Sequence, residues 1–166
     1  MAAWLEAFLT FDVSEPRLYA LFFLLGSFAV ATVSDVKHLA AQREFLEVWA
    51  AFAVVVFVLD VWLAEFEPTP WLLAKWALIP LLSLLSWEKV GPFLHLALGD
   101  VCACAAAASL LPPGLVVAFY LVLKVTSYPA ASLLARGRSH YPFMPVVTFA
   151  TVAVLAWALW LGPWIV

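Results

Sequence analysis

Charged residues are scarce in this chain. They make up 11% of its 166 residues, whereas hydrophobic residues make up 67%. A soluble domain is roughly half apolar and about one quarter charged. The composition therefore excludes an ordinary soluble domain and indicates an all-α integral membrane protein with no sizeable soluble domain. The lipid bilayer is an expected partner, and the net charge of −3 gives no sign of a nucleic-acid partner.

Cysteine is also rare, with only Cys102 and Cys104 present. Residues two apart on a helix point in different directions, so we expect neither a mutual disulfide nor a shared metal ion. No other cluster has the spacing of metal ligands, and no Ser-His-Asp set is readable. The sequence predicts no metal and no cofactor. Loop or interfacial positions outside the catalysis are expected for His38, His95 and His140.

No basic segment precedes the first apolar residues. Residues 1–17 contain Glu6, Asp12 and Glu15 and do not resemble a cleavable signal peptide. We expect this segment to be an amphipathic or irregular lead-in on the outer face of the membrane. Residues 18–166 would then form the membrane domain.

Apolar runs, by contrast, are abundant. Crossing a bilayer takes about 20 apolar residues in a helix. Runs of suitable length, separated by short polar or proline-containing turns, cover residues 18–33, 45–63, 71–87, 93–110, 115–134 and 142–166. The sequence therefore predicts a bundle of about six transmembrane helices.

Lysine and arginine are unevenly distributed between the two sides of this bundle. The turns after the first, third and fifth runs contain Lys37, Arg43, Lys89, Arg136 and Arg138. The opposite side contains only Arg17 and Lys75. Because basic residues concentrate on the cytoplasmic side, we expect the turn after the first run to face the cytoplasm and both termini to lie outside the cytoplasmic membrane.

Two carboxylates occur at membrane depth in this topology. Asp35 closes the first apolar run, and Asp100 lies within the Ala-rich fourth run, about two turns or roughly 10 Å from its start. An ionisable group at such depth is costly and indicates function. Two neighbouring carboxylates share a proton, so one can activate a water while the other protonates a leaving group. The alternative is a purely structural role, in which Asp35 is an ordinary interfacial acid at a helix end and Asp100 is the partner in an internal ion pair.

Three short motifs resemble one family. The run Ala97-Leu98-Gly99-Asp100 resembles the GxGD motif of membrane aspartic proteases. Ser34-Asp35 before a basic loop is similar to the first catalytic aspartate of type IV prepilin peptidases and archaeal preflagellin peptidases. The run from Tyr141 to Pro145, YPFMP, resembles the PFxP element of the same family. Small size and the lack of a cysteine-bearing zinc domain resemble the archaeal members. Ala97 and Cys102 depart from the family pattern.

The resemblance implies a membrane-embedded aspartic endopeptidase with Asp35 and Asp100 as the catalytic pair. Its substrates would be pilin- or archaellin-like precursors with a short basic leader and an apolar helix, cut at the cytoplasmic face. Motif support or substrate binding is expected from Gly99, Pro142, Phe143 and Pro145. An acidic rim that attracts the basic leader is expected at Glu44, Glu47 and Glu88.

Two more charges, Asp60 and Lys124, interrupt apolar runs. Buried charges usually pair, and a Lys124–Asp60 bridge is favoured over a Lys124–Asp100 contact. An alternative function is a small proton- or ion-coupled transporter or channel subunit that uses the intramembrane charges of Asp60, Asp100 and Lys124. The absence of a visible internal repeat disfavours it. A purely structural membrane subunit is the third possibility.

Overall fold

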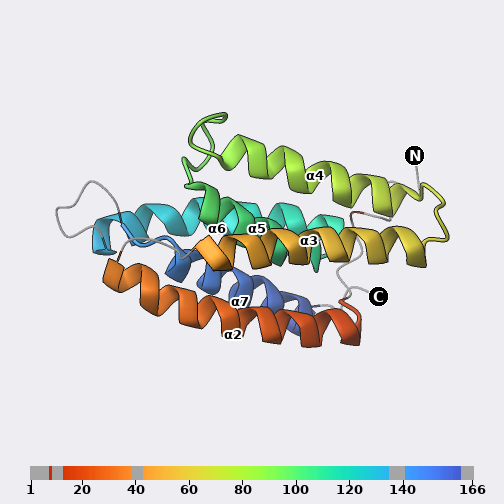
Figure 1. Cartoon of the computed structure of the whole chain (residues 1–166), viewed down its shortest axis with the longest axis horizontal. Helices are drawn as coiled ribbons and strands as arrows, with labels where there is room; N and C mark the ends of the chain where they lie inside the picture. The colour runs from red at the N-terminus through yellow and green to blue at the C-terminus, as the bar shows by residue number, and fades with distance from the viewer. Residues whose placement is uncertain (1–7, 9–12, 39–42, 135–140, 162–166) are drawn as a thin grey trace.

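The computed structural model describes residues 8, 13–38, 43–134 and 141–161 (Figure 1). Over these residues the chain is helical and contains no β-strand, which confirms the all-α class for this part of the chain. The helices are α2 (Glu15–His38), α3 (Arg43–Leu63), α4 (Pro70–Ser86), α5 (Leu98–Ser109), α6 (Pro113–Leu134) and α7 (Met144–Leu161).

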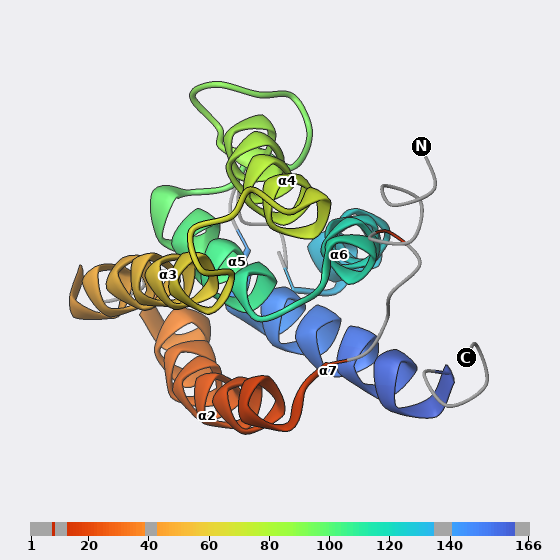
Figure 2. The same cartoon turned by 90° about the vertical axis from the view of Figure 1, so that its right-hand side faces the viewer.

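The short helix α5 lies at the centre of the molecule. Figure 2 shows it with the other helices arranged around it, and it contacts all five of them. Its small residues Ala103, Cys104, Ala106, Ala107 and Ala108 are fully buried. Small side chains let neighbouring helices approach closely. The Ala-rich composition therefore explains why a helix of 12 residues forms the core.

Within the described residues, three helices are long and apolar enough to cross a membrane, namely α2, α3 and α6. The other three are shorter apolar helices. At 1.5 Å per residue α5 is about 18 Å long, against roughly 30 Å for the hydrocarbon core of a bilayer. Large apolar side chains cover much of the outer surface, and Phe23 and Trp160 are 77% and 75% exposed. Such a surface suits a lipid environment.

The start of α5 differs from the sequence prediction. The helix begins at Leu98 rather than near Phe93, so Asp100 is its third residue and not two turns inside. The preceding residues instead form an ordered loop over positions 87–97. Gly91 fits tightly in this loop, because a Cβ there would lie 2.1 Å from the carbonyl oxygen of Leu85.

Backbone hydrogen bonds return this loop to the end of α4. The N–H of Leu96 donates to the carbonyl of Ser86 at 2.8 Å, and the N–H of Glu88 donates to the carbonyl of Leu96 at 3.0 Å. His95 adopts a positive φ of 55° where the chain reverses. The apolar residues before Asp100 are therefore used in a loop whose bonds satisfy part of the backbone.

Other boundaries also shift. Helix α2 begins at Glu15, inside the predicted lead-in, and continues past Asp35 to His38. Residues 1–7 and 9–12 of the predicted lead-in lie outside the described residues. The loop with Arg136, Arg138 and His140 is likewise outside them.

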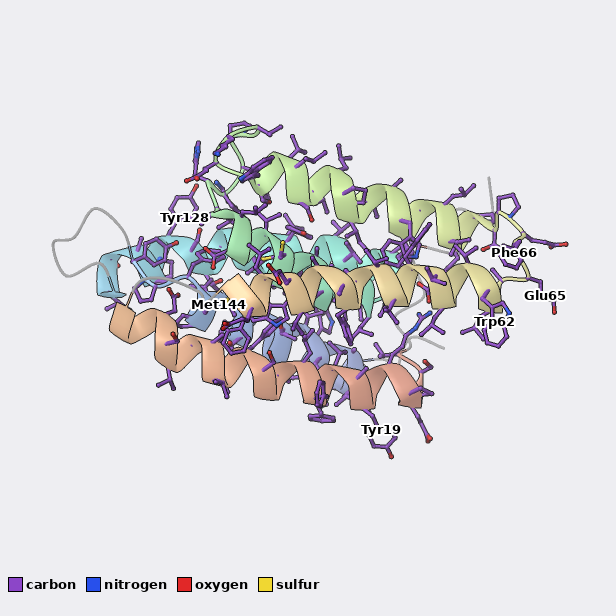
Figure 3. All side chains as sticks on the ribbon, in the orientation of Figure 1. Tyr19, Trp62, Glu65, Phe66, Tyr128 and Met144 are labelled. Atoms are coloured by element: carbon purple, nitrogen blue, oxygen red, sulfur yellow. The ribbon has the colours of Figure 1, made fainter. Side chains whose placement is uncertain are left out.

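The molecule has two ends of different character. At one end α2 stops and α3 and α7 begin; we call it the Asp35 end. At the other end α2 begins, α3 stops and α4 begins; we call it the Arg17 end. Figure 3 shows Met144 toward the first end and Tyr19, Trp62, Glu65 and Phe66 at the second.

The partner predicted for Asp60 is wrong. Asp60 lies at the Arg17 end, where its carboxylate binds Arg17 and Lys75, each with an N–O distance of 2.6 Å. Trp76 donates a further hydrogen bond at 3.0 Å. Lys124 instead donates to the backbone carbonyl of Phe93. Arg17 and Lys75 come from the starts of α2 and α4, which lie at the same end of the molecule as Asp60. Arg17 binds the Oδ1 atom of Asp60, and Lys75 binds its Oδ2 atom.

Candidate active site

Asp35 lies in the last turn of α2 and is only 7% exposed. Its Oδ2 atom accepts a hydrogen bond from the backbone N–H of Met144 at 3.0 Å, and the N–H of Phe143 is a second donor. Since α7 begins at Met144, the carboxylate faces the positive end of that helix dipole. This contact explains how an acid is accommodated at the unfavourable C-terminal end of its own helix.

The proline residues of the PFMP run define which backbone donors are present there. Pro142 and Pro145 have no N–H group, so within the run only Phe143 and Met144 can donate. Both of these N–H groups serve Asp35. This role was not predicted from the sequence, although a carboxylate at one helix end and a proline-flanked helix start on the same side are visible there.

Asp100 occupies the first turn of α5, directly after Gly99, and both residues are partly exposed. Its carboxyl group interacts electrostatically with Asp35 and with the exposed Glu88. No hydrogen bond to the Asp100 side chain comes from the part of the chain that the structure describes. The structure therefore brings Asp35 and Asp100 into one electrostatic neighbourhood, and it places Glu88 beside them.

Tyr141 adds a hydroxyl group to the same neighbourhood. Its ring lies 6.0 Å from that of Phe143, and its hydroxyl is 3.5 Å from the carbonyl oxygen of Ser127. Burial, and then the nearby carboxyl of Asp100, raise the pKa of Tyr141. The phenol therefore stays protonated over the physiological range and can donate a hydrogen bond. Tyr141 belongs to the YPFMP motif, but no role for it was predicted from the sequence.

Lys124 holds the loop that leads to Asp100. Its ammonium group binds the carbonyl of Phe93 and lies 5.3 Å and 5.4 Å from the ring centres of Phe93 and Tyr128. It makes neither of the ion pairs predicted for it. Its position indicates a supporting role, since Phe93 belongs to the ordered loop before α5.

The predicted acidic rim is partly assembled. Glu44 and Glu47 are exposed near the start of α3, which places them at the Asp35 end. Glu88 follows the end of α4 and acts electrostatically on Asp100. Of the predicted support residues, Pro142 and Phe143 are buried, and Pro145 is partly exposed. His95 is exposed in the loop.

A groove of about 360 Å³ lies beside the PFMP run, between α6 and α7. It is lined by Thr126, Pro129, Ala130, Leu133, Pro145, Val146 and Phe149. Pro145 follows Met144, whose N–H binds Asp35, so the groove begins next to the acidic pair. Its apolar lining can receive an apolar segment.

Metal ligation finds no support in the described residues, where no three His, Cys, Asp or Glu side chains come together as candidate ligands. Cys102 and Cys104 are both free thiols.

The candidate active site is thus a pair of interacting carboxyls, backbone donors on one of them, a phenol, and an apolar groove alongside. Comparison of the chain with models of protein families, with curated proteins and with solved structures finds no match.

Proposed function

We propose that this protein is a membrane-embedded aspartic endopeptidase whose catalytic pair is Asp35 and Asp100. The observation that carries the proposal is the electrostatic interaction between these carboxyls, which come from positions far apart in the sequence. The PFMP run meets the same pair through the backbone of Met144. Three motifs from one family resemblance thus lie at one end of the molecule.

The different surroundings of the two carboxyls give them different roles. Backbone N–H groups bind Asp35 and stabilise its anion, so Asp35 is the general base. Asp100 interacts electrostatically with the carboxylates of Asp35 and Glu88 and keeps the shared proton, so it is the general acid. A water gives a proton to Asp35 and attacks the peptide carbonyl. Asp100 then protonates the leaving nitrogen as the C–N bond breaks, without an acyl-enzyme.

The substrate in this proposal is a precursor with a short basic leader followed by an apolar helix. The exposed carboxylates of Glu44, Glu47 and Glu88 attract the leader. The apolar helix lies in the groove between α6 and α7, next to Pro145. The helices would form a membrane bundle around the short helix α5, with the Asp35 end facing the cytoplasm.

A cap without catalysis is the competing role for Asp35, because its bond to Met144 alone would stabilise the start of α7. The two roles are separated by Asp35→Asn, whose amide oxygen can still accept that hydrogen bond. We would measure cleavage of a pilin-like precursor in detergent, with Asp100→Asn and the wild type beside it. The proposal expects both variants to lose at least about 100-fold in rate while their melting temperatures stay near that of the wild type.

Full cleavage by either variant would overturn the proposal, and so would a wild-type protein that cuts no leader across several precursors. Glu65→Gln is a suitable control, since Glu65 is an exposed acid at the Arg17 end. The transporter alternative gains no support from Asp60, whose oxygen atoms are occupied by Arg17, Lys75 and Trp76.

A further inference from the structure

The Arg17 end contains a buried cluster with more positive than negative charge. Among the described residues, Asp60 is the carboxylate that binds both Arg17 and Lys75. The ring of Trp71 lies against both cations. Its centre is 4.8 Å from the Cζ atom of Arg17 and 5.0 Å from the Nζ atom of Lys75. With all three groups ionised, the cluster carries one excess positive charge in a largely apolar setting, which favours an anion nearby.

Arg17 is the member of the cluster that can reach such an anion. The Lys75 side chain is fully buried, whereas that of Arg17 is 23% exposed. Arg17 uses its Nη2 atom on Asp60, and within the described chain its Nε and Nη1 atoms make no hydrogen bond. These donors form a rigid fork that suits phosphate oxygens. The exposed Glu15 is two residues away and points to a different side of the helix.

An apolar groove opens directly beside this guanidinium. Its volume is about 300 Å³, and Ser14, Arg17 and Asp60 are its polar lining residues. Apolar lining comes from Ala20 on α2, from Phe52, Val56 and Leu59 on α3, and from Leu110 at the end of α5. Helix α2 packs mainly on α7 and α3 mainly on α5, which explains the space between α2 and α3 here.

We infer that this groove binds a membrane phospholipid. The phosphate accepts hydrogen bonds from the free donors of Arg17, and Ser14 adds a hydroxyl at the same mouth. One acyl chain lies between α2 and α3 along the apolar lining. The combination of a phosphate donor set and an apolar channel at the end of membrane-length helices matches the two parts of a phospholipid.

The test is lipid binding to the purified full chain by native mass spectrometry in a neutral detergent. Phosphatidylglycerol is compared with a diacylglycerol of the same chains, which lacks the phosphate, and with glycerophosphate, which lacks the chains. We expect phosphatidylglycerol to bind at least about tenfold more tightly than either. Equal binding of the diacylglycerol would overturn the phosphate contact, and equal binding of glycerophosphate would overturn the lipid assignment.

Two variants probe the two halves of the site. Arg17→Gln removes the charge and should weaken phosphatidylglycerol binding at least about tenfold, whereas Lys89→Gln, the matched change at the opposite end, should leave it unchanged. Ala20→Leu fills the groove without touching the ion pairs and should also weaken binding. If Arg17→Gln fails to fold, lipid binding by Ala20→Leu tests the inference in its place. Wild-type binding by Ala20→Leu would overturn the inference.

Discussion

The two ends of the molecule treat buried carboxylates in opposite ways. At the Arg17 end, Asp60 is bound by two cations and an indole N–H. At the Asp35 end, Asp35 is bound by backbone N–H groups, and no described lysine or arginine pairs with it or with Asp100. A carboxylate whose oxygen atoms are bound by two cations stabilises the fold. Two carboxyls that interact with each other can share a proton, which is the property a catalytic pair needs.

Removing the Asp60 charge should produce the largest loss of stability. Asp60→Asn leaves the fully buried Lys75 without a counter-charge. Breaking a buried ion pair from one side typically costs about 3–5 kcal/mol. We expect a loss of that size in the free energy of unfolding, measured by denaturation in detergent. The matched variant Lys75→Met leaves Asp60 with Arg17 and should cost less.

Equal stability of Asp60→Asn and the wild type would show that the Arg17 end is not a structural ion-pair cluster. The comparison between the ends would then fail, because Asp60 would be as dispensable for the fold as a catalytic residue.

Gly91→Ala should have the next largest effect, now at the Asp35 end. The added methyl group would meet the carbonyl oxygen of Leu85 at 2.1 Å, so the loop before α5 has to move. Overpacking of this kind costs about 1–3 kcal/mol. Since the loop leads directly to Asp100, the rate of precursor cleavage should fall further than the melting temperature alone explains.

Gly26→Ala is the control for this change. A Cβ at Gly26 meets nothing within 4 Å, and the residue lies inside α2. Alanine is favoured over glycine in a helix by roughly 1 kcal/mol, so this variant should be neutral or slightly more stable. A Gly91→Ala protein as active as Gly26→Ala would show that the loop does not position Asp100.

The positions of Asp35, Asp100 and the PFMP run at one end could be predicted from the sequence. Short turns between apolar runs force the chain to alternate direction. The end of the first run, the start of the fourth and the start of the sixth therefore lie on the same side. The start of α5 could not be predicted in this way. Residues 93–97 are largely apolar like a helix interior, and long-range bonds to α4 and from Lys124 on α6 keep them in a loop.

The partners of Asp60 were unpredictable for a related reason. Counting charges inside apolar runs points to Lys124 but ignores cations near run ends, such as Arg17 and Lys75. Which of them reaches Asp60 depends on the packing of α2, α3 and α4, and this information is absent from spacing along one helix. The cap that Asp35 gives to α7 was missed because it joins residues 109 positions apart.

Glu88→Gln should have a small effect, mainly on substrate capture, because the exposed Glu88 carboxylate acts only weakly on Asp100. Glu88 is exposed, so its charge acts mainly through attraction of a basic leader. On the proposed function, we expect the KM for a basic precursor to rise about two- to fivefold at low salt and the difference to fade above roughly 0.5 M salt. Glu65→Gln, at the opposite end, should change neither KM nor its salt dependence. An unchanged KM for Glu88→Gln would exclude Glu88 from the rim.

The smallest effect concerns Tyr141 and tests the contact between two motifs directly. Burial raises the pKa of Tyr141 first, and the Asp100 carboxyl raises it further. Asp100→Asn removes the second cause only, so the pKa of Tyr141 should fall yet stay above its ordinary value. Titration followed by NMR of ring-labelled tyrosine, assigned with Tyr141→Phe, measures this shift without any substrate. An unchanged pKa would mean that Asp100 does not lie beside the PFMP run, and the catalytic pair would lose its geometric basis even if the fold is correct.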